Sequence, residues 1–373
     1  MKSFLPLFIL IMSNCRSIDS DKSNMPISVD AAETQASSTP DSTPTIKDTG
    51  DKKIRFGVMV SKTEGRLINP ETQALIAKNL GVNYVRARID LKEWNGNNAM
   101  YDAYKAAGLK VLLNINYGIP RDAMGGHDPI PFPTDMDAYS KTVNSVLDKY
   151  KPEVLVVENE EDNPFYHSGS ADDYIRELQT AIKIAHARGV KVTNGGITVR
   201  EACLIVYDDL VQSGRKDEAM NFIGKAVPPA FIKRLNNMNN PQIARQVEFG
   251  RKILAAYKNL DLDYVNFHWY EPVQARANAA ANTVKFSPEI FAYVADYLKK
   301  KTGKPVMTNE FGVLNSSPEL VKGILKAAYD AKLSYAIFYS ADGGQGKAVA
   351  LQNASGDLRD NGVAFRDFVK QAR

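Results

Sequence analysis

The sequence predicts an α/β protein, a closed (β/α)8 TIM barrel that occupies residues 51–373 and carries a helical insertion between its fifth and sixth strands. Two observations lead to this fold class. From residue 54 onward, apolar strand patterns and amphipathic helix patterns alternate eight times, which is the repeat of such a barrel. The competing doubly wound sheet usually has a glycine-rich phosphate loop after its first strand, and residues 60–65, V-S-K-T-E-G, do not form one.

The first four strand–helix units have clear boundaries. The expected strands cover residues 54–60, 83–89, 109–115 and 153–157, and the expected helices cover residues 70–80, 97–107, 134–150 and 170–188. Gly81, Gly108 and Gly189 follow three of these helices, as helix-terminating glycines do. Ser170 and Asp173 have the spacing of a helix-starting capping box.

The last four units follow the same pattern. The expected strands cover residues 190–193, 263–267, 305–309 and 334–339, and helices are expected at residues 241–257, from 287, from 317 and at 360–371. The sequence Ser-Pro-Glu at 287 and at 317 is typical of a helix start, with serine as the N-cap and proline in the first turn. Residues 198–240 are the expected insertion, which is partly helical in pattern.

Two of the expected strands end in acidic residues. Residues 154–162 are V-L-V-V-E-N-E-E-D, and residues 306–312 are V-M-T-N-E-F-G. In a barrel all strands point their carboxyl ends at one mouth, so strands four and seven should bring their glutamates together. Two carboxylates across a pocket suit glycoside hydrolysis, in which one protonates the leaving oxygen and the other attacks the anomeric carbon or activates water.

Four features at the strand ends resemble clan A glycoside hydrolases, a barrel group that includes cellulases, mannanases and β-xylosidases. The pair Asn159-Glu160 matches the clan's Asn-Glu pair on strand four, and Glu310 matches its glutamate on strand seven. The tripeptide His268-Trp269-Tyr270 resembles the His-x-Tyr of strand six, and Arg86 resembles the arginine of strand two. The resemblance covers the barrel and not the leader.

The resemblance implies a retaining hydrolase of oligo- or polysaccharides. Glu160 would be the general acid/base, protonated when it meets the substrate, and Glu310 the nucleophile. Arg86 and a hydrogen bond from Tyr270 would keep Glu310 ionised. Asn159 would bind the sugar 2-hydroxyl, and His268 and Trp269 would line the substrate site.

The sequence departs from the clan at three places. Strand eight lacks the usual tryptophan, so Tyr339 or Trp269 is expected to supply the stacking face. Strand three has Asn114, Asn116 and Tyr117 where a histidine is often found, and Glu161 replaces a common proline. These departures keep open a second class of function, a non-catalytic glycan-binding surface protein. Trp94 is expected to pack rather than to bind sugar.

Other acids near Glu160 leave an alternative for the catalytic acid. Glu158 has the same strand parity as Glu160 and is either the acid or a partner in a barrel ion pair. Glu161 and Asp162 are expected to be solvated loop charges.

Composition excludes some partners. The net charge is +4 with no Lys/Arg run, which argues against nucleic acid. His127, His167, His186 and His268 lack metal-ligand spacing, so neither a metal nor a cofactor is expected. We expect a monomer that acts on carbohydrate.

The N-terminal residues are predicted to be a leader. Residues 4–12 form an apolar stretch that is too short to span a bilayer, which takes about 20 residues. Cys15 follows it as in a bacterial lipobox, although Asn14 is unusual there, and an ordinary secretory signal is the alternative. Residues 16–50 have the composition of a disordered tether. Together they predict export and a lipid anchor at Cys15 in the cell envelope.

Overall fold

The computed structural model describes residues 53–118, 128–227, 231–232, 235, 241–273, 287–343 and 347–372. The predicted signal peptide, the acylated Cys15 and the tether lie outside these residues and stay predictions. Within the described part of the chain, no helix has the length and hydropathy needed to cross a bilayer.

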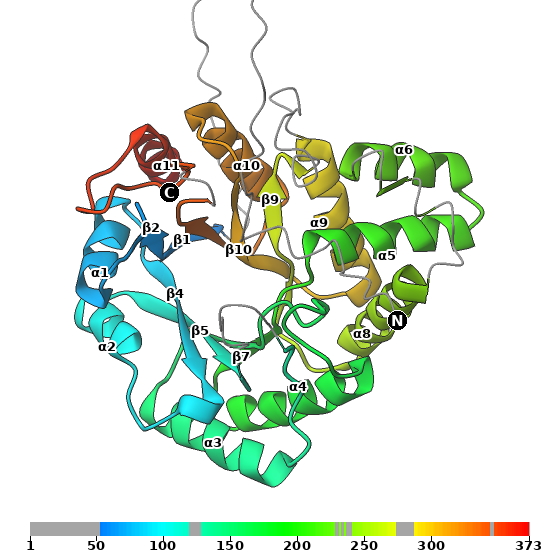
Figure 1. Ribbon diagram of the computed structural model, residues 1–373, viewed down its shortest axis with the longest axis horizontal. Coiled ribbons are helices and arrows are strands. Elements are labelled where there is room, and N and C mark those ends of the chain that lie inside the picture. The colour runs from blue at the N-terminus through cyan, green and yellow to red at the C-terminus, as the bar shows by residue number, and fades with distance from the viewer. Residues whose placement is uncertain are drawn as a thin grey trace, which may run out of the picture.

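Eight parallel strand positions form one sheet that closes on itself, so the predicted barrel is confirmed (Figure 1). In chain order the positions are β1 (Arg55–Val60), β4 (Tyr84–Asp90), β5 (Lys110–Asn116), β6 (Val154–Val157), β7 (Lys191–Asn194), β8 (Val265–Asn266) with β9 (Trp269–Glu271), β10 (Val306–Val313) and β11 (Tyr335–Ser340). The β1–β11 pairing joins the first strand to the last. Parallel bridges from Thr193 to Tyr264 and from Ile197 to Phe267 close the remaining side.

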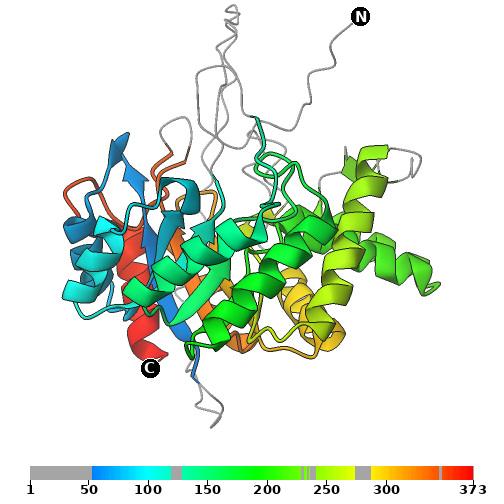
Figure 2. The ribbon, with the colours of Figure 1, turned by 90° about the horizontal axis from the view of Figure 1, so that it is seen from below.

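Helices surround this sheet, one after each strand position (Figures 1 and 2). They are α1 (Pro70–Asn79), α2 (Ala99–Ala106), α3 (Met136–Lys149), α4 (Ala171–His186), α8 (Pro241–Asn259), α9 (Pro288–Thr302), α10 (Pro318–Asp330) and α11 (Asp360–Gln371). Several predicted caps are present: Ser170 and Asp173 form a capping box, and the Ser317 side chain accepts from Leu320 N–H. Two short elements lie in the loops: a 3₁₀ turn, η1 (Leu91–Glu93), and a small hairpin of β2 (Lys62–Thr63) and β3 (Arg66–Leu67).

The predicted insertion after the fifth strand contains two described helices, α5 (Val199–Gln212) and α6 (Lys216–Ala226). Helix α5 is buried along most of its length, so the insertion is part of the core. Thr198 caps α5, because its side chain accepts a hydrogen bond from Glu201 N–H. Most of the remainder of residues 198–240, from 228 on, lies outside the described residues.

Strands six and seven differ from the simple strands that the pattern predicts. Strand six is split into β8 and β9, with Phe267 and His268 between them. Strand β10 runs past Glu310 to Val313, and its register against β11 shifts by one residue between Thr308 and Phe311. An extra residue of this kind is a β-bulge, which changes the direction in which side chains point. The bulge spans Asn309 and Glu310, and both contribute side chains to the same inner site described below.

We predict that Gly57→Ala, inside the barrel, destabilises the protein. A Cβ at Gly57 would lie 2.4 Å from the Tyr84 carbonyl oxygen and 2.5 Å from Ile337 Cδ1. Overpacking of this kind costs about 1–3 kcal/mol of unfolding free energy, or more where backbone must move. The matched control is Gly224→Ala in α6, where a Cβ meets nothing within 4 Å; it should gain about 0.5–1 kcal/mol. Urea denaturation of both variants checks the prediction, and equal effects would contradict it.

Candidate active site

Arg86 on β4 is the central cation of the barrel mouth. Its side chain is only 3% exposed. One guanidinium nitrogen, Nη1, donates to Glu310 Oε2 at 2.6 Å, and the other, Nη2, donates to Asn114 Oδ1 and Asn159 Oδ1, each at 2.5 Å. Because these partners come from β5, β10 and the end of β6, one buried charge connects four strand positions. The predicted contact between Arg86 and Glu310 is confirmed.

Glu310 is held as an ionised carboxylate. Its Oε1 accepts a hydrogen bond from the Tyr270 hydroxyl at 2.6 Å, as predicted, and its Oε2 accepts from Arg86. Burial by itself raises the pKa of this carboxyl group, but the charges of His268 and Arg86 and the bond from Tyr270 outweigh it. The pKa of Glu310 is lowered to about 2. A buried carboxylate that stays charged at neutral pH is suited to be a nucleophile.

Glu160 faces Glu310 from the loop after β6. Its Oε2 accepts from Asn163 Nδ2 at 2.6 Å, and its Oε1 lies 3.2 Å from His268 Nδ1. The backbone of Glu160 is left-handed, with φ of 50°, and that of Glu158 is too, with φ of 68°. Non-glycine residues avoid this conformation, which is found mainly where surrounding contacts impose it at functional sites. From this left-handed turn the Glu160 carboxyl group reaches His268 at the mouth.

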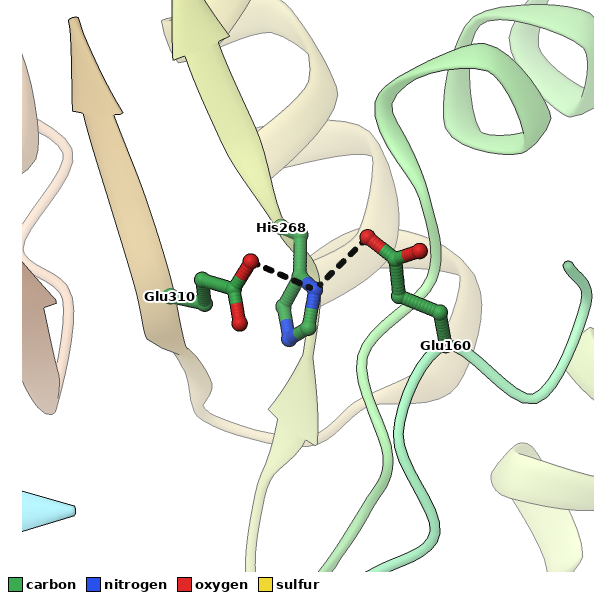
Figure 3. A group of neighbouring side chains, drawn as sticks. All are labelled: Glu160, His268 and Glu310. Carbon is green, nitrogen blue, oxygen red and sulfur yellow. Dashed lines mark hydrogen bonds and ion pairs between the residues drawn. The ribbon is translucent and has the colours of Figure 1, made fainter. Parts of the chain in front are cut away.

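His268 lies between the two glutamates (Figure 3). Its Nε2 is 2.8 Å from Asn309 Oδ1. That oxygen also accepts from Asn266 Nδ2 at 2.7 Å, and Asn266 Oδ1 in turn accepts from Asn309 N–H. This chain fixes Asn309 Oδ1 as an acceptor, so His268 Nε2 must carry a hydrogen. The other ring nitrogen, Nδ1, then shares one proton with Glu160 Oε1.

Burial and charge act in opposite directions on this histidine. Burial lowers the pKa of His268, whereas the carboxylates of Glu310 and Glu160 raise it, and the net shift is upward. The charge of Glu310 and the contact with Glu160 thus favour the protonated form of His268. The pair is arranged to hold a proton that can be given to a bound molecule.

One oxygen of Glu160, one of Glu310 and a ring nitrogen of His268 lie within 4.8 Å of one another. Among the described residues this is the one group of acids and histidines close enough to share a cation. Arg86 already contacts Glu310 at 2.6 Å, which supplies the positive charge that a metal would provide. The donor set thus fits a proton-transferring pair, and the expectation that no metal is needed stays a prediction.

Aromatic side chains surround the carboxylates. The rings of Tyr270 and Tyr339 meet edge to face with centroids 6.2 Å apart. Tyr339, which was expected to be a stacking residue, is half-buried at the end of β11. Burial and the nearby charges of Glu160 and Glu310 raise the pKa of Tyr166, which places this half-buried tyrosine beside the same pair. These rings are the candidates for a sugar-binding surface.

The expectation that Trp269 supplies a stacking face is wrong. Trp269 is fully buried and donates from Nε1 to Glu271 Oε1 at 2.7 Å. Its ring packs against Phe267 and against Phe291 of α9. Successive side chains of a strand point to opposite faces, so His268 and Tyr270 face the mouth while Trp269 faces the helices. Trp94 packs against Tyr150, as predicted.

The expectation that Glu161 and Asp162 are solvated is also wrong. Both are buried: Glu161 accepts from Asn194 Nδ2 and from the Tyr257 hydroxyl, and Asp162 accepts from Thr198 N–H and its hydroxyl. Asp162 connects the β6 loop to the insertion, and Glu161 connects it to β7 and α8. Glu158 is buried as well and accepts from Tyr117 N–H at 2.6 Å. Glu160 contacts His268, and this distinguishes it from Glu158.

Sequence reasoning missed two residues of the site, Asn163 and Tyr166. Both lie in the loop directly after the acidic strand end, and Asn163 holds the Glu160 carboxyl group. Their position directly after a barrel strand could have indicated both residues, because the active sites of such barrels are built from the loops that follow the strands. Asn309, which precedes Glu310 in the sequence, was not among the expected site residues, although it fixes the His268 tautomer.

We predict that the protein loses stability as pH rises from 6 to 9. Burial raises the pKa of Glu158 to about 8 and that of Asp162 to about 7. The folded state binds these protons more tightly than the unfolded state, so their stabilisation is complete below about pH 4, near the unfolded pKa values, and is lost as pH rises through 7 and 8. The Tm measured at several pH values should fall, and Glu158→Gln should reduce the fall. A Tm that rises over this interval would contradict the assignment.

No family model matches the sequence, and no curated protein matches it. Solved structures do match. A variant of an endo-β-1,4-glucanase from Xanthomonas axonopodis pv. citri has a TM-score of 0.54 at 10% identity, with 85% of this chain and 99% of that chain covered. A β-glucosidase from Pyrococcus furiosus has a TM-score of 0.51 at 12% identity, with 87% and 96% covered. A GH30 endoxylanase from Clostridium papyrosolvens has a TM-score of 0.50 at 14% identity, with 86% and 72% covered.

These neighbours are clan A glycoside hydrolases, the group that the strand-end residues resemble. At such low identity the likeness concerns the fold. The chain therefore has the barrel fold of clan A glycoside hydrolases, and its Glu160–His268–Glu310 group lies at the mouth of that barrel.

Proposed function

We propose that this protein is a retaining glycoside hydrolase that cleaves O-glycosidic bonds of an oligo- or polysaccharide. One observation carries the proposal: one carboxyl oxygen of Glu160 and one of Glu310, two glutamates in unlike environments, lie within 4.8 Å of each other. Retaining enzymes have carboxyl groups about 5–5.5 Å apart, whereas inverting enzymes need about 6.5–9.5 Å to hold a water. The separation favours retention.

In the first step Glu310 attacks the anomeric carbon while Glu160 protonates the departing glycosidic oxygen. The bond to that oxygen breaks, and an ester forms between the sugar and Glu310. Arg86 and Tyr270 keep Glu310 ionised and fix its two oxygens before the attack. The proton shared with His268 is available to Glu160 for the leaving group.

In the second step Glu160, now a carboxylate, takes a proton from water, and the hydroxide formed replaces Glu310 at the anomeric carbon. Asn163 and His268 hold the two oxygens of Glu160 through both steps. Asn159 is anchored through Oδ1 to Arg86, which leaves its amide nitrogen for the sugar 2-hydroxyl. Tyr166 and Tyr339 would contact the sugar rings.

The exported, lipid-anchored location is part of the proposal. It is supported by the short apolar stretch before Cys15 and the polar composition of residues 16–50. The mature protein would act as a monomer in the bacterial cell envelope, tethered through its N-terminus.

Glu310→Gln should abolish turnover of an activated aryl glycoside, because an amide is a poor nucleophile. Glu160→Ala should lower the rate by about 10²–10⁴-fold, the usual contribution of a general acid/base. Azide should restore the rate of Glu160→Ala and yield a glycosyl azide of retained configuration, since azide needs no general base. A panel of aryl glycosides with NMR of the first-formed anomer measures these outcomes.

Glu158→Gln is the matched control, because it changes a neighbouring acid that does not contact His268. Wild-type rates for both Glu310→Gln and Glu160→Ala would show the assignment to be wrong. If the wild type binds oligosaccharides without cleaving them, the glycan-binding alternative is favoured instead. This alternative is the second candidate because no tryptophan among the described residues lies at the mouth.

Tyr270→Phe should raise the pKa of Glu310, because it removes a hydrogen bond that stabilises the carboxylate. We expect the acidic limb of the kcat/KM profile to move to higher pH, and kcat to fall about 10²-fold, as when one preorganised donor is lost. Tyr339→Phe, which leaves the Glu310 contacts in place, is the control.

The same assays with EDTA should give unchanged rates, and inactivation by EDTA would contradict the metal-free mechanism.

A further inference from the structure

The amino ends of the barrel strands form a basic face. Six of the eight strand positions begin with a basic residue or follow one by one to three positions: Arg55, Lys110, Lys151, Lys191, Lys304 and Lys332. We call these six residues the amino-end face. Lys110, Lys151, Lys191 and Lys332 are exposed, and Arg55 and Lys304 are half-buried. The whole chain has 47 basic and 43 acidic residues, so this concentration is local.

Helix dipoles account for only part of this face. The carboxyl ends of barrel helices lie at the same end as the strand starts, and basic residues close to the last helical turn are favoured there. Lys151, Lys304 and Lys332 directly follow the C-caps of α3, α9 and α10 and fit that explanation. Arg55 follows no described helix, and Lys110 and Lys191 stand three and four residues after the C-caps of α2 and α4, so the dipole does not explain them.

Three members of the face are held in place by aromatic rings. Arg55 lies over the Tyr335 ring at 4.9 Å, Lys110 over Tyr84 at 5.6 Å, and Lys191 over Tyr264 at 5.8 Å. Three acids lie in the same turns, and each already has partners. Glu153 contacts Lys110 and the Tyr335 hydroxyl, while Asp261 and Asp263 contact His186. The face therefore keeps an excess of positive charge at fixed positions.

A hollow of about 520 Å³ opens at this face. Two cations, Lys53 and Arg55, and two hydrogen-bonding residues, Asn83 and Tyr84, line it, and its other lining residues are apolar: Ile54, Phe56, Val369 and Ala372. The cations and hydrogen-bonding groups suit a phosphate group, which accepts hydrogen bonds and carries negative charge.

The two ends of the barrel differ in charge. At the mouth Glu310 is paired with Arg86, and burial raises the pKa of Glu158 to about 8 and that of Asp162 to about 7. Helix α4, with 16 residues, is about 24 Å long, so the ends are separated by more than the Debye length of about 8–10 Å in physiological salt. Charges at the mouth therefore have little influence on an anionic surface that approaches the amino-end face.

The place where the chain enters the barrel decides between anionic partners. Strand β1 starts at Arg55, so the preceding 54 residues, including the predicted anchor, join the barrel at this face. The C-terminus lies at the same end, at the lower edge of Figure 2. We propose that the amino-end face docks on an anionic lipid surface, with phosphate headgroups at Lys53 and Arg55. Docking directs the mouth, with Glu160 and Glu310, away from the membrane.

The test uses the chain from residue 15 onward with Cys15→Ser, so that neither the predicted signal peptide nor an acyl chain contributes. It should sediment with vesicles of phosphatidylcholine containing about 30% phosphatidylglycerol, and not with phosphatidylcholine alone. Binding should be lost at about 500 mM salt, where screening is strong. The triple variant Lys151→Glu, Lys191→Glu, Lys332→Glu should bind at least about 100-fold more weakly, since each basic residue near such a surface is worth about 1 kcal/mol.

The matched control makes the same change in net charge on exposed helix positions: Lys141→Glu, Lys216→Glu, Lys322→Glu. It should retain at least a third of the wild-type binding. Equal losses in both triple variants would overturn the proposal, because net charge and not this face would then govern binding. Binding to heparin with no binding to anionic vesicles would overturn it in favour of a soluble polyanion.

A second measurement does not depend on the folding of the triple variant. A fluorophore on Lys332→Cys, and separately on Lys322→Cys, is introduced in the Cys15→Ser background, where Cys203 is buried and protected. A quencher on the lipid headgroups should quench the dye at residue 332 and leave that at residue 322 bright. Equal quenching at the two positions would contradict the proposed orientation.

Discussion

The ion pair between Arg86 and Glu310 is the contact on which the mouth of the barrel depends. A buried guanidinium cannot lose its charge, so the surrounding chain must supply acceptors. It does so from three other strand positions, through Asn114, Asn159 and Glu310. Removing one partner of such a pair leaves an uncompensated charge, at a cost of about 3–5 kcal/mol. The same contact that joins the strands also keeps the proposed nucleophile ionised.

Neighbouring carboxyl groups in this barrel are driven in opposite directions by their surroundings. Glu310 has cations on one side and a hydroxyl donor on the other, and its pKa is about 2. Glu158 and Asp162, only a few residues from Glu160, have burial as the largest influence, and their pKa values rise to about 8 and about 7. The protonated acids can remain in the core because they carry no charge to compensate. The acidic residues near the site therefore have different roles. An acid next to positive charge stays ionised and can take part in the chemistry, whereas a buried acid without such a neighbour is protonated and belongs to the core.

The fold was predictable to within a few residues because its local signals agree with one another. Helix α11 matches the expected range, and capping serines at 170 and 317 start α4 and α10 where expected. Strands six and seven were the exceptions. Strand seven contains the bulge at Asn309 and Glu310. The split of strand six into β8 and β9 places His268 at a break between short strands, and an apolar pattern gives no sign of such a break.

By itself, the sequence determined the barrel and the meeting of strand ends four and seven, because strand order dictates which carboxyl ends meet. It left Glu158 as an alternative to Glu160, and the contact of Glu160 with His268 appears only in the folded chain. Tertiary structure decided which acids are exposed, since Glu161 and Asp162 are covered by α8 and the insertion, contacts that no local pattern records. It also decided that Trp269 packs under α9, and that a bulge directs both Asn309 and Glu310 into the mouth. Burial and bulges depend on what lies across the fold, and only the closed barrel brings those partners together.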